Sequence, residues 1–121
     1  MREVPGDASV LCADSCSERL EKLTRTLEHE GYAVSRAQTA PDCLAAIAAT
    51  HPDVVVLDID LLYVDRQNIA EYITHISEST MVLLTVDDLS RWRDARPPFV
   101  RAVQDRTQTS LIVEQVRDLA R

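Results

Sequence analysis

Lysine is nearly absent from this chain, and the scarcity of positive charge limits what the protein can bind. Lys22 is the only lysine among 121 residues, and the 20 acidic residues outnumber the 13 basic ones, so the formal net charge is -7. Because contacts to phosphate backbones need clustered lysine and arginine, we expect no direct nucleic-acid binding by this domain. No apolar run approaches the length of a membrane span either, so we expect no membrane insertion.

Aromatic residues are also scarce, and this restricts the kind of core that the chain can form. They make up 4% of the residues, whereas hydrophobic residues make up 45%. A core of mostly valine, leucine, isoleucine and alanine suits a parallel sheet covered by helices. The length suits one domain. We expect residues 1–7, which are polar and contain Pro5 and Gly6, to form a disordered leader before a single domain at 8–121.

The three cysteines do not form the framework of a disulfide-rich protein. Cys12, Cys16 and Cys43 are odd in number, and no secretory signal precedes them. A metal site at Cys12 and Cys16 would need further ligands, and no nearby histidine or cysteine completes a set of four. We therefore expect free thiols and a cytoplasmic protein.

One apolar stretch organises the rest of the chain. Residues 54–57 are three valines and a leucine, and Asp58 and Asp60 follow them. Such a short, wholly apolar run is typical of a strand that is buried on both faces. The strand therefore ends in two carboxylates, where it leaves the sheet.

Four further strands and five helical segments are predicted around this stretch. The first helix has a capping-box pattern, Ser15 with Glu18, and Gly31 after its end. Thr39 caps the second helix, and a polar loop through Arg66 follows the buried strand. The other strands are predicted at 9–13, 32–37, 81–86 and 99–103, and the helices at 16–30, 40–50, 69–76, 89–95 and from 110 onward.

Alternating strands and helices predict a doubly wound parallel sheet with helices on both faces. In such sheets, ligands meet the carboxyl ends of the strands near the point where the strand order reverses. Asp14, Asp58 and Thr85 each lie at the end of a predicted strand. We therefore expect these three side chains to converge at one edge of the sheet.

On Asp14, the 54–58 strand and Thr85, the chain resembles the receiver domains of two-component response regulators over about residues 8–120. The resemblance implies a flavodoxin-like (CheY-like) α/β fold with five strands in the order 2-1-3-4-5. It implies that Asp58 accepts a phosphoryl group from a histidine kinase and that the Thr85 hydroxyl contacts this group. It also implies that Asp14, Asp58 and the backbone carbonyl of Asp60 hold Mg²⁺.

The sequence departs from the family's pattern at several of these positions. Ala13 replaces one of two acidic residues, and Gln104 stands where the family has a lysine. Gln104 can hydrogen-bond a phosphoryl oxygen but supplies no charge. With one carboxylate fewer, we expect Mg²⁺ to bind weakly or not at all. Leu62, Arg66 and Arg101 also replace the proline, the glycine and the switch aromatic that are usual in the family.

These departures favour an atypical receiver, a pseudo-receiver that signals by binding a partner with impaired or absent phosphorylation at Asp58. The alternative is a phosphorylation-competent receiver that uses Mg²⁺. A remote alternative is a phosphatase, since Asp58 and Asp60 also resemble a DxD nucleophile motif, but that family needs a downstream lysine and a longer chain. We expect a signalling module and not an enzyme.

The partner expected for this module is a histidine kinase or another signalling protein, and a homodimer is left open. Trp92 lies among Arg91, Arg93 and Arg96. An aromatic residue flanked by arginines is typical of an interface hot spot. The alternative is that Trp92 only covers the edge of the sheet.

Overall fold

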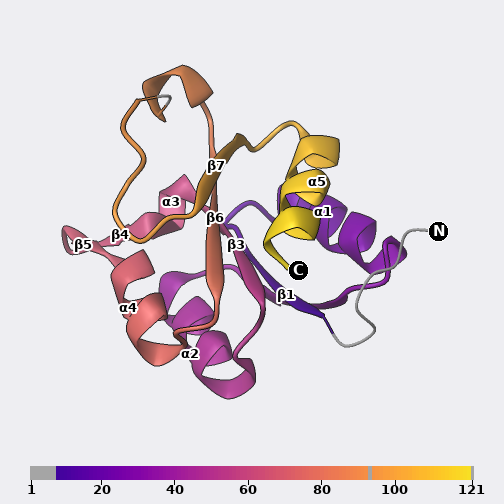
Figure 1. Cartoon of the computed structure of the whole chain (residues 1–121), viewed down its shortest axis with the longest axis horizontal. Helices are drawn as coiled ribbons and strands as arrows, with labels where there is room; N and C mark the ends of the chain where they lie inside the picture. Colours follow the sequence, from indigo (N-terminus) through magenta and orange to yellow (C-terminus); the bar gives the residue numbers. More distant parts are fainter. Residues whose placement is uncertain (1–7, 93, 121) are drawn as a thin grey trace.

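The computed structural model describes residues 8–92 and 94–120, and it contains a five-stranded parallel sheet. The order of the strands is β2-β1-β3-β6-β7, which confirms the predicted order 2-1-3-4-5 (Figure 1). The expected leader at 1–7 lies outside the described residues. The sheet strands are β1 (Ser9–Ala13), β2 (Ala33–Ala37), β3 (Val54–Asp58), β6 (Met81–Val86) and β7 (Ala102–Asp105).

Strand β3 is central because both of its neighbours are buried strands and helices cover both of its faces. Each of its residues is buried. Val55 and Leu57 point into one hydrophobic cluster, while Val54 and Val56 point into the other. Side chains alternate between the two faces of a strand, so this run needs apolar residues at every position. The apolar run ends at Leu57, and the buried Asp58 that follows it lies at the edge that carries the site.

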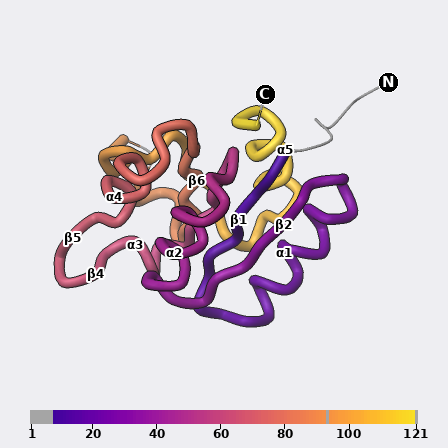
Figure 2. The backbone as a smooth tube through the Cα atoms, turned by 90° about the horizontal axis from the view of Figure 1, so that it is seen from below, coloured from indigo at the N-terminus to yellow at the C-terminus, as the bar shows by residue number. Residues whose placement is uncertain are grey.

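Helices cover the two faces of the sheet in pairs, as Figure 2 shows from below. Helices α1 and α5 contribute leucine, isoleucine and valine to one cluster, and α2 and α4 contribute to the other. Each of these helices buries an apolar stripe against the strands. The helices are α1 (Ser17–His29), α2 (Ala40–Thr50), the short α3 (Ile59–Leu62), α4 (Ile69–Ile76), α5 (Thr109–Leu119) and the 3-10 helix η1 (Leu89–Trp92).

The helix ends agree with the predictions at two places and differ at one. The Thr39 side chain accepts a hydrogen bond from the Asp42 N–H, and Gly31 has a φ of 102° after α1, as predicted. The predicted capping box at Ser15 is wrong. The helix begins after Cys16, and the Asp14 carboxylate accepts the Cys16 N–H at 2.8 Å. The Asp14 contact therefore holds the residue at the start of the helix, and it is a different contact from the one expected of Ser15.

The segment after β3 is a hairpin and not the plain polar loop that we predicted. Strands β4 (Tyr63–Val64) and β5 (Gln67–Asn68) pair in antiparallel orientation around Asp65 and Arg66. These two residues have φ values of 50° and 68°, which is the backbone of a type I′ turn. The usual signal for this turn is an Asn-Gly or Asp-Gly pair, so Arg66 concealed it.

The last strand begins three residues later than predicted. We predicted it at 99–103, but β7 spans Ala102–Asp105. Phe99 adopts a φ of 68°, and the Val100 N–H bonds to the Pro97 carbonyl in a turn. The two prolines therefore lead into a turn, which uses the apolar residues that looked like the start of a strand.

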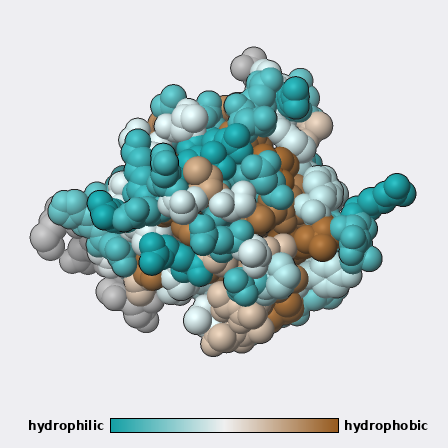
Figure 3. Space-filling view, turned by 180° about the vertical axis from the view of Figure 1, so that it is seen from behind, coloured by the Kyte–Doolittle hydropathy of each residue, from teal (hydrophilic) through white to brown (hydrophobic). Residues whose placement is uncertain are grey.

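The surface is mixed. Hydrophilic side chains cover most of the face drawn in Figure 3, with hydrophobic patches between them. Within the part of the chain that the structure describes, none of the helices combines the length and the apolar character needed to cross a bilayer.

Candidate functional site

Asp58 ends strand β3, and its carboxylate is held inside the protein. The residue is 0% exposed to solvent. The Thr85 hydroxyl donates a hydrogen bond to Oδ1 at 3.1 Å, and the Asp60 N–H donates to Oδ2 at 3.2 Å. Strand register explains the first contact, because Thr85 is the direct partner of Asp58 in the pairing of β3 with β6. The expected convergence of Asp58 and Thr85 is therefore present.

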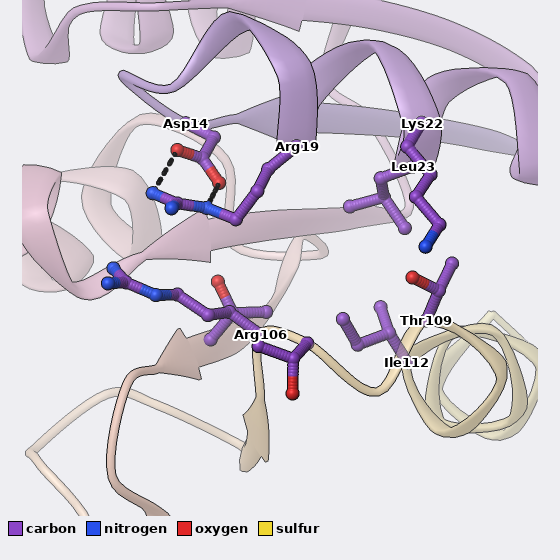
Figure 4. A pocket seen from close by; sticks show the side chains of 9 residues that line it. Asp14, Arg19, Lys22, Leu23, Arg106, Thr109 and Ile112 are labelled. Atoms are coloured by element: carbon purple, nitrogen blue, oxygen red, sulfur yellow. Dashed lines mark hydrogen bonds and ion pairs between the residues drawn. The ribbon is translucent and has the colours of Figure 1, made fainter.

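Asp14 lies at the end of the neighbouring strand and forms a bidentate ion pair with Arg19 (Figure 4). The guanidinium donates from Nε to Oδ2 and from Nη2 to Oδ1, both at 2.9 Å. Arg19 reaches Asp14 because it lies on α1, which begins three residues after Asp14. The same Nη2 is 3.8 Å from Asp58 Oδ2. Arg19 thus joins Asp14 and Asp58 at one edge of the sheet.

A second arginine approaches the carboxylates from the loop that follows β7. The Nη1 of Arg106 is 3.4 Å from Oδ2 of Asp58 and 3.4 Å from Oδ2 of Asp60. Asp60 lies in the first turn of α3 with a side chain that is 56% exposed, and it also lies 4.0 Å from Arg19. The site is therefore a cluster of three carboxylates and two guanidinium groups.

Gln104 occupies a buried position in strand β7. It is the strand partner of Thr85. Its Oε1 accepts a hydrogen bond from the Asp105 N–H at 2.8 Å, so this oxygen serves the adjacent backbone. Gln104 thus lies one strand away from Asp58. The positive charge near Asp58 comes from the two arginines.

The three carboxylates, Thr85 and Gln104 were predicted from the sequence, whereas Arg19 and Arg106 were not. A usable signal was present. A buried carboxylate needs a counter-charge or hydrogen bonds, and the expected lysine is missing. Arg19 and Arg106 lie shortly after the ends of the first and fifth strands, so they were the nearest arginines that could replace it.

Burial raises the pKa of the Asp58 carboxyl above its ordinary value, and the Asp14 carboxylate adds to this increase. The hydrogen bonds from the Asp60 N–H and the Thr85 hydroxyl, together with the charge of Arg106, oppose it. The pKa of Arg19 is also raised, mainly by its hydrogen bond to Asp14. Asp58 therefore carries its negative charge at a cost, which the arginines reduce.

This shift predicts how stability depends on pH. A raised folded-state pKa means that the folded chain binds the Asp58 proton more readily than the unfolded chain does. The stabilisation from this proton is fully present below the unfolded-state pKa and is lost as pH rises through the folded-state pKa. Wild type should therefore lose stability relative to Asp58→Asn as pH rises from about 4 through the folded-state pKa of Asp58. Urea unfolding of both proteins at several pH values measures this difference, and a relative gain by wild type would contradict it.

A cavity of about 210 Å³ borders the cluster between α1 and α5. Figure 4 shows Arg19 and Arg106 on one side of it and Lys22 and Thr109 on the other, with Leu23 and Ile112 between them. The only lysine of the chain thus faces the same hollow as the two arginines.

The residues of this edge do not fit a Mg²⁺ ion in the arrangement observed. Both oxygens of Asp14 and both of Asp58 already accept hydrogen bonds from groups of the chain. Mg²⁺ demands near-octahedral oxygen coordination at about 2.1 Å. Over residues 8–92 and 94–120, no three acidic, histidine or cysteine side chains are grouped so that they could hold a metal ion. The predicted set of Asp14, Asp58 and Asp60 is adjacent, but arginines occupy it.

Comparison with known proteins gives the fold. No protein-family model matches the chain, and no curated protein matches it. The response regulator TrrA of Thermotoga maritima, solved with Mg²⁺ and BeF, is similar with a TM-score of 0.80 and 19% identity over 93% of this chain and 98% of that one. A Francisella receiver domain gives 0.79 and 17% over 94% and 97%. A CheY-like receiver domain of Methanospirillum hungatei gives 0.74 and 20% over 93% and 96%.

Proposed function

We propose that this chain, which has the fold of CheY-like receiver domains, is an atypical receiver in two-component-type signal transduction. It acts as a protein-interaction module in which phosphorylation of Asp58 is impaired or absent. One observation carries this proposal. The Asp58 carboxylate is 0% exposed, and Thr85 and the Asp60 N–H already engage its two oxygens.

Phosphoryl transfer to Asp58 would require this arrangement to open. The attacking oxygen must approach phosphorus in line, and cations must neutralise the charge that develops on the phosphoryl oxygens. Arg106 is next to Asp58 Oδ2, but it is also paired with Asp60. An incoming phosphoryl group would have to displace the arginine contacts before it gained any of its own. This requirement supports slow transfer or none.

The interaction surface that we propose lies between η1 and β7, around Trp92. A hollow of about 520 Å³ has an apolar lining, two cations, Arg96 and Arg101, and one acid, Asp94. The apolar lining is formed by Leu89, Trp92, Ala102 and Val103. Arg96 donates to the Arg101 carbonyl at 2.6 Å, which ties the two together. Trp92 is only partly buried, so it can contact a partner. Arg93, which we had grouped with Trp92, lies outside the described residues.

Partners suited to this surface are a histidine kinase or another signalling protein. A partly buried tryptophan beside arginines has the composition of an interface hot spot. The surface is formed by a segment that does not include Asp58, so it can remain constant whatever the state of that residue. This separation is what a module that signals by binding alone requires.

A small phosphodonor tests the proposal. After incubation with Mg²⁺ and acetyl phosphate, the intact mass of the wild-type chain should show no phosphoryl adduct within minutes. The reason is that both Asp58 oxygens are engaged and that Gln104 stands where the family has a lysine. Asp58→Asn is the matched control for adducts at other sites. A phosphoryl mass in wild type that is absent from Asp58→Asn would contradict the proposal.

The second candidate is a receiver that accepts a phosphoryl group on Asp58. The hydrogen bond from Thr85 to Asp58 favours it, since this hydroxyl is already placed beside the acceptor. Arg106 could supply the cation that the missing lysine does not. The similar Thermotoga maritima response regulator holds Mg²⁺ and BeF. The mass measurement separates the two candidates.

A further inference from the structure

We infer that Arg19 and Arg106 are built-in counter-cations that take the place of a divalent metal among Asp14, Asp58 and Asp60, and that they exclude Mg²⁺ from these carboxylates. The inference deepens the proposed function and rests on it, because it explains how the charges of the three carboxylates are neutralised in the absence of a metal ion. It differs from the expectation of weak Mg²⁺ binding in its cause. The earlier expectation rested on the carboxylate that is missing at Ala13. The inference adds that two arginines occupy the carboxylates that are present.

Arg19 occupies the position of a shared counter-ion. Its guanidinium binds both oxygens of Asp14 at 2.9 Å, and its Nη2 lies 3.8 Å from Asp58 and 4.0 Å from Asp60. A single cationic group therefore contacts all three carboxylates, as a metal ion would. Its planar fork suits the bidentate contact with Asp14, which a lysine could not make.

Arg106 approaches Asp58 from the other side of β3 in the sheet. It follows β7, whereas Arg19 follows β1, so the two guanidinium groups come from different parts of the chain. Oδ2 of Asp58 lies 3.4 Å from Arg106 and 3.8 Å from Arg19. This buried oxygen thus lies between two positive charges.

The charges balance closely without any ion from solution. Three ionised aspartates and two arginines leave a net charge of -1 in the cluster. A metal ion that entered would bring two further positive charges beside two guanidinium groups, and like charges at such distances repel. It would also have to replace hydrogen bonds that the chain already makes to Asp14 and Asp58. Mg²⁺ loses its bound water reluctantly. Carboxylate oxygens that already accept hydrogen bonds from the chain offer little in return for that water.

The arginine contacts are more than exposed surface ion pairs. The side chains of Arg19 and Arg106 are 29% and 22% exposed, and that of Asp58 is fully buried. By comparison, the pair between Arg25 and Glu21 has side chains that are 76% and 54% exposed. Solvent screens the exposed pair but screens the cluster much less.

Magnesium titration of the full chain tests the inference. Wild type, Arg19→Gln and the double variant Asp14→Asn/Arg19→Gln are titrated with MgCl₂, and binding is followed by calorimetry and by the melting temperature. We expect no saturable binding by wild type up to about 10 mM, and binding at least about tenfold tighter by Arg19→Gln, because its carboxylates are released. The double variant should lose this gained affinity. Arg25→Gln removes an exposed arginine from the same helix and should behave as wild type.

Two outcomes would overturn the inference. One is Mg²⁺ binding by wild type as tight as that by Arg19→Gln. The other is no gain of affinity in a folded Arg19→Gln. If Arg19→Gln does not fold, Arg106→Gln takes its place, with the same gain expected and the same absence of gain as the contradiction. Arg19→Lys provides a further check, since it keeps the charge and should remain insensitive to Mg²⁺.

The outcome can be separated from that of the proposed function. Tight Mg²⁺ binding by wild type without a phosphoryl adduct would reject the inference and leave the interaction module standing. Exclusion of Mg²⁺ together with a phosphoryl adduct on Asp58 would reject the proposed function and leave the inference standing.

Discussion

Replacing Arg106 with methionine is expected to lower the free energy of unfolding by about 2 kcal/mol. Removing one member of a buried ion pair typically costs about 3–5 kcal/mol, because the remaining charge is left without its partner. Arg106 is 22% exposed, and Arg19 remains near Asp58, so we expect less than that range. Methionine keeps much of the aliphatic stem and removes the charge. Urea unfolding at pH 7 measures the change.

The cost should depend on Asp58, and a double-mutant cycle isolates this dependence. Adding Asp58→Asn to Arg106→Met should recover most of the lost stability, because the buried charge is then absent. Arg25→Met is the matched control, since its exposed pair with Glu21 should be worth less than about 0.5 kcal/mol. An equal loss from Arg106→Met in the presence and the absence of Asp58 would show that Arg106 acts through packing alone.

Trp92→Ala is expected to weaken partner binding by about 2 kcal/mol, or about 30-fold in Kd. Trp92 lines the hollow beside Arg96 and Arg101. Truncating a hot-spot tryptophan removes the apolar contact area that its ring offers to the partner. Asp58→Asn should leave the affinity nearly unchanged, because Asp58 is buried on another part of the sheet edge. Calorimetry with a partner isolated by its binding to the chain gives both values.

Two controls make the Trp92 result specific. Trp92 also packs against the hydrophobic core, so the melting temperature of Trp92→Ala must show that it remains folded. Leu111→Ala removes an exposed hydrophobic side chain from α5 and should not affect binding. If Asp58→Asn abolishes binding and Trp92→Ala does not, the surface around Trp92 is not the interface.

The buried strands were predictable because each is a short run of mostly β-branched and aliphatic residues, which is typical of a strand covered on both faces. The run that ends at Asp58 is apolar at every position, which only a strand covered on both faces needs. The hairpin and the start of β7 were not predictable in this way. They depend on positive φ values at Asp65, Arg66 and Phe99, which no glycine announces. Positive φ values are uncommon outside glycine, so the local sequence gives no signal for these turns.

Some residues of the candidate site were likewise predictable from the sequence, and others were not. Asp58 and Thr85 were predictable as neighbours because strand register and the carboxyl ends of parallel strands place them together. The roles of Arg19 and Arg106 depend on where two long, flexible side chains turn, and sequence spacing does not specify this. Charge balance was the available guide, since buried carboxylates without a lysine require another cation.

A titration with Mg²⁺ and beryllofluoride, a phosphoryl analogue, tests most directly whether Asp58 is closed to phosphoryl chemistry. It is followed in two-dimensional amide spectra of the ¹⁵N-labelled chain, with Asp58→Asn as the control. We predict that the amide resonances of Asp58, Thr85 and Gln104 do not move beyond the small uniform shifts seen in the control. Saturable shifts at the ends of β3, β6 and β7 in wild type, absent from Asp58→Asn, would contradict the account.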